Sequence, residues 1–400
     1  MRLGAEPLAL HGGPPVRATL LPYGRHEIDD DDVAAVVETL RSGWITTGPK
    51  VAELEAAVAQ ATGAAHAVAF NSGTAALHGA AFAAGLGPGD EAITTPITFC
   101  ATANCVVYQG ATPVFADVAE DTLNIDVAEV ARRITDRTKA ILAVDFSGHP
   151  ADLQPLIDLA TARGLLLVED ACHAIGATYR GRPVGGLSHM TVFSFHPVKH
   201  ITTGEGGMVT TNDARLAEKL RLFRNHGIDV EAHRRQSSAA WRYDMVALGF
   251  NYRLSDIGCA LGVSQLRKLP ANLARRRALA DRYTAALAAL DGVRPPMVKP
   301  DVESAWHLYV IRLELEKLRG GRDEVLAALR AENIGVNVHY IPVHRLTYYR
   351  ERFGYQGGEL PVAESAHETL LTLPLFHGMA DADADDVLCA LEKVVRHFRR

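Results

Sequence analysis

The chain has 400 residues, of which 48% are hydrophobic and 22% charged, a composition typical of a globular protein and unlike that of a disordered chain or a membrane bundle. Its 41 Lys and Arg against 47 Asp and Glu give a formal net charge of −6, so no basic excess is present to neutralise a nucleic-acid backbone. We therefore expect neither nucleic acid nor a membrane as a partner.

The cysteines and the N-terminal segment indicate the cellular compartment. The five cysteines are scattered and include no C-x-x-C pair, which is typical of reduced thiols in a cytosolic protein. The N-terminus, residues 1–6 included, gathers no long uncharged apolar run, so we expect neither a signal peptide nor a spanning helix. The expected location is the cytoplasm.

The first half of the chain predicts a doubly wound α/β fold. An acidic run at 29–32 favours the start of a helix. From about 51 to 213, short apolar runs, turns and longer helical patterns repeat as in βαβ units, and the runs are nearly continuous, as in strands buried on both faces. The predicted strands are 67–70, 91–94, 113–116, 141–144, 165–168, 192–195 and 208–211, with helices at 74–84 and 153–162 among them. They predict a mostly parallel seven-stranded sheet.

The second half predicts a smaller unit. A helix begins after Ser255, runs to Lys268 and is interrupted at Pro270, and a further helix continues to about 290. An alternating strand at 306–313, a helix at 322–332 and a strand at 336–340 indicate an α+β unit. We therefore expect an N-terminal segment and large domain over 1–265, and an interdomain helix with a small C-terminal domain over 266–400.

The segment 70–77 joins a strand end, a turn and a helix start. Gly73 lets the backbone approach a ligand closely, and the free N–H groups of the first helical turn, with the hydroxyls of Ser72 and Thr74, make a phosphate cradle. On this segment alone, an ordinary helix cap is the favoured alternative.

A second candidate group is Asp170, which follows the hydrophobic run at 165–168. A buried carboxylate needs a cationic partner, and a protonated pyridine nitrogen supplies one. A metal ligand and a helix N-cap are the alternatives. The spacing of Asp170 and His173 is not that of two helical zinc ligands, and no third ligand is nearby, so we expect no metal.

The third candidate group is Lys199, which comes a few residues after a buried strand and before the glycine-rich return at 202–207. Its amine can point into the crevice at the carboxyl ends of the strands, where desolvation lowers its pKa and makes it nucleophilic. A phosphate-binding lysine is the alternative, although the spacing of a nucleotide-triphosphate loop is missing. The order of phosphate cradle, acid at a strand end, and Ser194 five residues before the lysine predicts a pyridoxal phosphate site.

With these motifs in this order, the chain resembles the DegT/DnrJ/EryC1/StrS family of sugar aminotransferases from about 21 to 394. The matching segments are 71–77, 110–118, 169–174, 194–199, 249–256 and 373–376. The resemblance implies the fold-type I aspartate aminotransferase architecture, with a large domain, a smaller α+β C-terminal domain, and a homodimer with shared active sites.

The resemblance also implies roles for residues. Lys199 would be the Schiff-base lysine and proton shuttle, Asp170 the partner of the pyridine nitrogen, and His173 the neighbour of the ring hydroxyl. The other implied cofactor contacts are Ser194, Thr74 and the backbone of Gly73 and Ala75 at the phosphate, Phe99 stacked on the ring, and Asn251 or Arg253 from across the dimer interface.

Within the family, the segments 98–104, 144–150 and 194–207 are similar to those of the UDP-4-amino-4,6-dideoxy-N-acetyl-altrosamine transaminases of pseudaminic acid biosynthesis. The implied substrate-binding residues are Tyr23, Thr46, Thr47, Gly48, Ser72, His339 and Tyr340. Two positions depart from the family pattern, His200 after the lysine and His377 where proline is frequent, and they leave the exact sugar open.

The implied reaction is a ping-pong transfer of an amino group from L-glutamate to a keto group, at C4, of a nucleotide-linked 6-deoxy keto sugar, with pyridoxamine 5'-phosphate as the intermediate form of the cofactor. Another keto sugar or a cyclitol of antibiotic biosynthesis is an alternative substrate. A pyridoxamine-dependent dehydratase and a non-enzymatic regulator are further alternatives. The dehydratases carry histidine at the lysine position, whereas this chain has Lys199.

Overall fold

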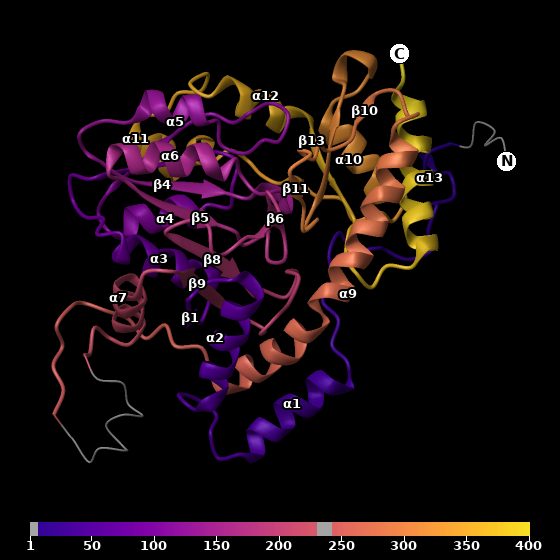
Figure 1. Cartoon of the computed structure of the whole chain (residues 1–400). Helices are drawn as coiled ribbons and strands as arrows, with labels where there is room; N and C mark the ends of the chain where they lie inside the picture. Colours follow the sequence, from indigo (N-terminus) through magenta and orange to yellow (C-terminus); the bar gives the residue numbers. More distant parts are fainter. Residues whose placement is uncertain (1–6, 230–241) are drawn as a thin grey trace.

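The computed structural model describes residues 7–229 and 242–400, so residues 1–6, which enter the expectation on a signal peptide, lie outside it. A seven-stranded sheet lies at the centre of the larger unit, in the order β1-β9-β8-β5-β4-β2-β3 (Figure 1). Its strands are β1 (His66–Phe70), β2 (Glu91–Thr94), β3 (Thr112–Phe115), β4 (Thr138–Val144), β5 (Leu166–Asp170), β8 (Met190–Ser194) and β9 (Gly207–Thr211).

The strands from β8 through β5, β4 and β2 to β3 pair in parallel, whereas β9 pairs antiparallel with both β1 and β8. This confirms the mostly parallel sheet and its seven predicted strands. Alternate strand residues pack against helices on opposite faces. One face is covered by α3 (Gly73–Ala83), α4 (Ala101–Tyr108) and α7 (Ala214–Arg224), and the other by α2 (Pro49–Thr62), α6 (Leu153–Arg163) and the start of α9 (Asp256–Leu287).

The acidic run at 29–32 begins a helix, as predicted. Asp29 is the N-cap of α1 (Asp30–Arg41), and its side chain accepts from the backbone N–H of Asp32 while the Asp32 carboxylate accepts from that of Asp29. This reciprocal capping box satisfies two N–H groups that a helix leaves free.

The predicted break at Pro270 is wrong. The chain forms one helix, α9, which begins after the cap at Ser255 and runs through Pro270 to Leu287. Figure 1 shows that α9 changes direction as it passes from the sheet to the C-terminal unit. Proline removes one hydrogen bond and bends a helix, while Leu269 and Leu279 keep both halves packed on hydrophobic cores. The expected division between 1–265 and 266–400 falls inside this helix.

The C-terminal unit is built on a sheet in the order β10-β12-β13. Its elements are β10 (Val293–Arg294), β12 (Tyr309–Leu313), β13 (Leu370–Leu373), α10 (Arg322–Ala331), α11 (Thr347–Phe353), α12 (Pro361–Thr369) and α13 (Asp381–Phe398). The helix expected at 322–332 is present, but 306–308 and 336–340 are not strands, because these segments turn toward the larger unit and only Asn337 makes an isolated bridge, with Thr372.

A third, small sheet and several short elements complete the described fold. The sheet has the order β11-β6-β7. The remaining elements are β6 (Thr178–Tyr179), β7 (Arg182–Pro183), β11 (Val302–Glu303), α5 (Val127–Arg133), and the 3-10 helices Ala9–His11, Phe146–Gly148, Leu315–Lys317 and Val343–Arg345. In the part of the chain that the structure describes, no helix has the length and apolar character needed to cross a membrane.

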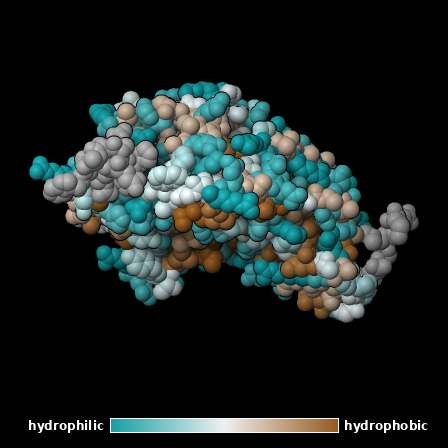
Figure 2. Space-filling model, turned by 90° about the horizontal axis from the view of Figure 1, so that it is seen from below, coloured by the Kyte–Doolittle hydropathy of each residue, from teal (hydrophilic) through white to brown (hydrophobic). Residues whose placement is uncertain are grey.

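Several large hydrophobic side chains remain exposed. Seen from below, the molecule shows hydrophobic groups gathered along the hollowed middle of this face (Figure 2). One short segment holds three such residues, with Met245 60%, Val246 58% and Leu248 75% exposed. Exposed apolar surface of this kind is typical of an interface with another chain.

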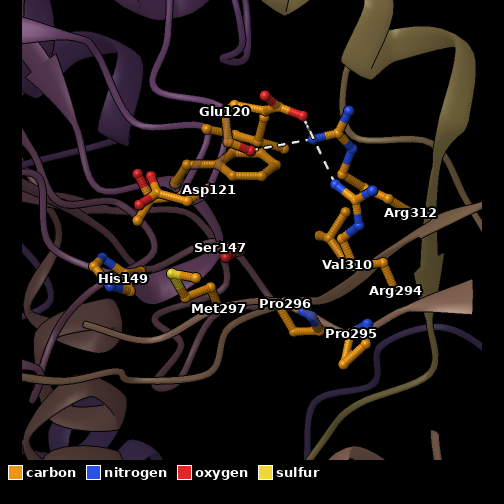
Figure 3. A pocket seen from close by; sticks show the side chains of 13 residues that line it. Glu120, Asp121, Ser147, His149, Arg294, Pro295, Pro296, Met297, Val310 and Arg312 are labelled. Carbon is orange, nitrogen blue, oxygen red and sulfur yellow. Dashed lines mark hydrogen bonds and ion pairs between the residues drawn. The ribbon is translucent and has the colours of Figure 1, made fainter. Parts of the chain in front are cut away.

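The two units meet at a cleft of about 380 Å³ (Figure 3). Arg312, on β12, donates to the backbone oxygen of Glu120 at 3.1 Å and pairs with its carboxylate at 3.7 Å. Arg294 reaches the same carboxylate at 3.7 Å. Both guanidinium groups are therefore engaged by Glu120, and the cleft is a polar joint between the units.

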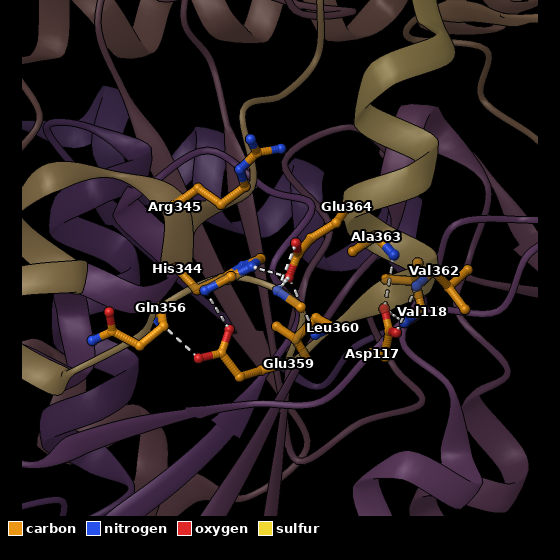
Figure 4. Close-up of polar contacts among 12 residues, drawn as sticks. Asp117, Val118, His344, Arg345, Gln356, Glu359, Leu360, Val362, Ala363 and Glu364 are labelled. Atoms are coloured by element: carbon orange, nitrogen blue, oxygen red, sulfur yellow. Dashed lines mark hydrogen bonds and ion pairs between the residues drawn. The ribbon is translucent and has the colours of Figure 1, made fainter. Parts of the chain in front are cut away.

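A second joint is formed by carboxylates that accept backbone N–H groups (Figure 4). Asp117, after β3, accepts from the N–H groups of Val362 and Ala363 at 2.9 Å each, at the start of α12. The carboxylate of Glu364 accepts from the N–H of Gly358 and contacts Nε2 of the buried His344 at 3.1 Å. These contacts join α12 to the sheet and to the preceding loop.

A metal interpretation of this joint is not needed to explain it. The ligand atoms of His344, Glu359 and Glu364 lie within 4.8 Å of one another. However, the Glu359 oxygens accept from the backbone N–H groups of Gln356 and Gly357. Both carboxylates therefore have partners in the loop itself.

Replacing Glu364 by alanine is expected to lower the free energy of unfolding by about 1.5–3 kcal/mol, because several backbone and imidazole hydrogen bonds to a charged group are lost. The matched control is Glu368→Ala, which breaks an exposed ion pair with Arg345 and is expected to cost at most about 1 kcal/mol. Urea denaturation followed by circular dichroism measures both, and equal losses would contradict the assignment.

Candidate active site

A cavity of about 580 Å³ opens at the carboxyl ends of the strands, where ligands bind in such sheets. Asp170 ends β5, Ser194 ends β8, and Lys199 follows in the next loop. The segment 337–340 of the C-terminal unit closes the other side. Of the residues expected at the site, those that line this cavity are Tyr23, Ser72, Gly73, Thr74, Phe99, Asp170, His173, Ser194, Lys199, His339 and Tyr340.

The expected phosphate cradle lies at the start of α3. The Ser72 side chain caps this helix by accepting from the N–H of Ala75 at 3.0 Å. A Cβ atom on Gly73 would lie 3.0 Å from Cβ and 3.1 Å from Oγ of Ser194, so glycine leaves the Ser194 hydroxyl open to the cavity. A helix start, free N–H groups and two hydroxyls suit a phosphate group. Ala75 itself does not line the cavity, and its backbone contact stays a prediction.

Asp170 is 5% exposed, and the hydrogen bonds that it accepts in the described part of the chain come from uncharged groups. One oxygen accepts from the Thr102 hydroxyl at 2.6 Å and the other from the N–H of Cys172 at 3.2 Å. Within residues 7–229 and 242–400, no cation forms an ion pair with it. A buried carboxylate without a counter-ion fits a ligand that brings its own positive charge, such as a protonated ring nitrogen.

Lys199 lies beside the same cavity. Burial lowers the pKa of its amine, while the neighbouring Cys172 and Asp170 favour the charged form. The amine is therefore held closer to its uncharged, nucleophilic form than a surface lysine is. Its Nζ lies 3.3 Å from Nε2 of His307.

His173 and Tyr340 approach the cavity from opposite units. The Tyr340 hydroxyl lies 3.2 Å from Nε2 of His173, and the two rings are nearly parallel. Burial, followed by the charge of Lys199, holds the pKa of His173 well below its usual range. The ring is therefore neutral, and its tautomer is set by the groups around it.

Three functional candidates were not identified from the sequence. They are Thr102, His307 and Arg276, which is fully buried on α9. His307 lies in the segment that was interpreted as an alternating strand, and Arg276 lies in a run of arginines typical of a solvated helix face. Only their packing in the folded chain distinguishes them.

The family model for the DegT/DnrJ/EryC1/StrS aminotransferase family matches residues 26–392. The chain belongs to this family. The fold-type I architecture that the resemblance implied is confirmed with it.

Relatives in the family match nearly the whole chain. It is 43% identical over 382 residues to the spore coat polysaccharide biosynthesis protein SpsC of Bacillus subtilis, covering 95% of this chain and 98% of that one. Its structure is similar to Helicobacter pylori PseC, an aminotransferase involved in the biosynthesis of pseudoaminic acid, with a TM-score of 0.88, 32% identity, and coverage of 95% and 100%. The putative sugar aminotransferase Spr1654 of Streptococcus pneumoniae, in its PLP-form, matches with a TM-score of 0.87, 32% identity, and coverage of 94% and 99%.

Some residues that the family resemblance implied lie outside the cavity of this chain. Thr46, Thr47 and Gly48 precede α2, where Gly48 N donates to the Asp256 carboxylate at 2.7 Å. These three were expected to bind the sugar, and a single chain does not bring them to the cavity. Asn251 and Arg253 also lie outside it. Their expected contacts run from one subunit to the other and stay predictions.

A pair of carboxyl groups lies buried behind the end of β5. Asp145 and Glu169 are both 0% exposed, and Oδ2 of Asp145 and Oε1 of Glu169 have no hydrogen-bond donor among the described residues. Glu169 also accepts from the hydroxyls of Ser188 and Thr191 at 3.0 and 2.8 Å. Burial raises the pKa of both groups, and for Asp145 the Glu169 charge raises it further. The pair therefore retains a proton that exposed carboxyl groups would release.

This pair predicts a pH dependence of stability. Because the folded pKa is raised, its contribution to stability is fully present below the unfolded pKa of about 4 and is lost as the pH rises through the folded value. Glu169→Gln cannot ionise, so its melting temperature should rise relative to the wild type over that window, corresponding to a slope of about 1.4 kcal/mol per pH unit for one proton. Thermal melts from pH 4 to 9 measure it, and parallel curves would contradict the shared proton.

Proposed function

We propose that this chain uses pyridoxal 5'-phosphate, bound through Lys199, to transfer an amino group from L-glutamate to the C4 keto group of a nucleotide-linked 6-deoxy keto sugar. The family supplies the reaction class, transamination. Two relatives support the sugar, because SpsC and PseC are named for spore coat polysaccharide and pseudoaminic acid. The PLP-form and PMP-form structures of Spr1654 support the cofactor.

The observation that carries the proposal is the pairing of two groups across one cavity. Asp170 is a buried carboxylate that forms no ion pair within the described part of the chain, and Lys199 is an amine whose pKa is lowered by burial. The hydroxyls of Thr74, at the start of α3, and of Ser194, at the end of β8, line the same cavity. These three features fit the ring nitrogen, the aldehyde and the phosphate of the cofactor. When bound, pyridoxal phosphate supplies an electron sink for the carbon that loses its proton.

The residues have separate tasks in this scheme. The Asp170 carboxylate keeps the proton on the ring nitrogen, because an uncompensated buried anion stabilises a neighbouring cation. The Lys199 amine would take the proton from the substrate carbon and return it to the exocyclic carbon of the cofactor ring, on the other side of the shared nitrogen. His173 and Tyr340 would orient the ring hydroxyl, and the start of α3 would hold the phosphate.

Both substrates would use this cavity in turn, with the pyridoxamine form of the cofactor carrying the amino group between them. Initial rates measured against both substrates are therefore expected to give parallel lines in double-reciprocal plots. Intersecting lines would contradict a shared site.

The proposal includes a homodimer with shared active sites in the cytoplasm. The exposed apolar residues at 245–248 and the hollowed apolar face of Figure 2 support a large interface. Thr46–Gly48 and the segment 251–253 would then complete the cavity of the partner subunit. Light scattering, which measures the mass in solution, tests for the dimer.

The five free cysteines support a cytoplasmic location.

The test of the function begins with the absorption spectrum of the purified protein mixed with pyridoxal phosphate. A visible band that is lost on adding L-glutamate supports the cofactor and the donor together. Candidate nucleotide-linked 4-keto sugars are then added, and the aminated product is detected by mass spectrometry. If the band forms and no keto sugar is aminated while a cyclitol ketone is, the sugar part of the proposal is wrong.

A further inference from the structure

The imidazole of His307 has no part in the steps described above, yet it lies against the reactive amine. Its Nε2 is 3.3 Å from Lys199 Nζ. His307 is 4% exposed and lies two residues before β12, whereas Lys199 follows β8. The contact therefore reaches the lysine from the C-terminal unit.

Two other rings hold His307 in place. The ring of His173 packs against it with centroids 4.3 Å apart, and that of His200 lies 5.5 Å away. Nε2 of His200 is itself hydrogen-bonded to the backbone oxygen of Ala305 at 2.8 Å. The three rings fill the space behind Lys199, so His307 has little freedom to turn away from the amine.

The charge of the nearby Arg276 disfavours a positive charge on the Lys199 amine. Arg276 is 1% exposed and donates to the backbone oxygens of Trp306, His307 and Leu375 at 2.9–3.3 Å. Among the residues that the structure describes, no carboxylate forms an ion pair with Arg276. The titratable and charged groups facing Lys199 are Cys172 and Asp170 from the end of β5, Arg276 from α9, and His173, His200, His307 and His339.

The second ring nitrogen indicates which tautomer is present. Nδ1 of His307 is buried and has no hydrogen-bond partner within the described residues. A buried N–H without an acceptor is less tolerated than a buried lone pair without a donor. The proton therefore belongs on Nε2, and this N–H can donate only to an uncharged amine, because an ammonium group has no lone pair.

We propose that His307 is a positioning residue whose Nε2–H hydrogen bonds to the Lys199 amine whenever this amine is not bonded to the cofactor, holding it uncharged beside the cavity. The inference rests on the proposed function, since it assigns a neighbour to the lysine of that site. Burial holds the pKa of His307 well below its usual range, so the ring stays neutral while it does this.

The test compares the wild type with His307→Leu, His307→Gln and His307→Asn. Pyridoxal phosphate is added to the cofactor-free full-length protein from pH 6 to 10, and the rate at which the visible band forms is recorded. This rate follows the uncharged fraction of Lys199. In His307→Leu the midpoint is expected to rise by about 0.5–1 pH unit, the effect of one lost hydrogen bond.

The glutamine variant is the conservative rescue, because its amide N–H can occupy the place of Nε2, and it should keep the wild-type midpoint. Asparagine carries the same amide one methylene short and should behave like leucine. At pH 7 and saturating L-glutamate, the leucine and asparagine variants are expected to form the pyridoxamine state about 3- to 10-fold more slowly, with KM for glutamate unchanged.

The outcomes separate this inference from the function it rests on. If the wild type forms no band at all, the proposed function is wrong. If the wild type forms the band and all four midpoints coincide, the role of His307 is overturned while the function stands. If the leucine variant does not fold, the comparison of glutamine with asparagine decides alone, and equal midpoints for these two would overturn the role.

Discussion

Replacing Lys199 by alanine is expected to lower the rate of amino transfer about 10⁴-fold, because the covalent anchor of the cofactor and the carrier of the proton are lost together. The visible band that depends on the bond between Lys199 and the cofactor should not form in this variant. L-glutamate should no longer change the spectrum on the timescale of the wild type. Single-turnover absorption measurements with L-glutamate give both quantities.

The control for this substitution is Lys139→Ala. The Lys139 side chain is 55% exposed and lies 4.0 Å from Asp90, so its loss should leave the rate within about 2-fold, as for most surface substitutions. A small primary amine added to the Lys199→Ala protein should restore part of the rate by acting as a soluble base. A variant that keeps the wild-type rate without such an amine would falsify the assignment of Lys199.

Asp170→Asn is expected to lower kcat about 10²–10³-fold, the loss typical of removing one preorganised electrostatic partner from an active site. The amide is of nearly equal size and can still hydrogen bond to Thr102, whose hydroxyl contacts Asp170 at 2.6 Å. The negative charge that keeps a ring nitrogen protonated is lost. Steady-state rates with L-glutamate measure the effect, and thermal melts check that the variant remains folded.

The matched control is Asp117→Asn, which removes the same charge from another buried carboxylate. Asp117 accepts from two N–H groups at the start of α12 and does not line the cavity. Its loss should lower the melting temperature while kcat stays within about 2-fold. If Asp117→Asn and Asp170→Asn slow the reaction equally, the loss reflects folding, and Asp170 has no special role.

The sequence was sufficient to predict the sheet and the principal groups of the candidate site. Strands buried on both faces read as continuous apolar runs, and all seven were recognisable from this property. Ser72, Asp170, Ser194 and Lys199 each lie within a few residues of a strand end, and strands that pair in parallel bring such positions to one edge. The sheet could therefore be predicted from the apolar runs, and the principal groups of the site from their positions relative to the strand ends.

The helix through Pro270 and the irregular segment at 336–340 show where local pattern fails. Proline and alternation are local signals, but packing against two hydrophobic cores keeps α9 continuous, and closure over the cavity keeps 336–340 out of a sheet. Tertiary contacts can outweigh strand propensities, because the propensities of different residue types differ by only about 1 kcal/mol.

By itself, the sequence determined the order of the strands along the chain, the family, and the presence of a lysine and an acid at strand ends. Only the tertiary structure decided that Asp170 forms no ion pair with any residue that the structure describes, that His307 lies against Lys199, and that Arg276 is buried rather than solvated. The physical reason is that burial and charge pairing depend on segments more than 60 residues apart, whose distances no local pattern contains.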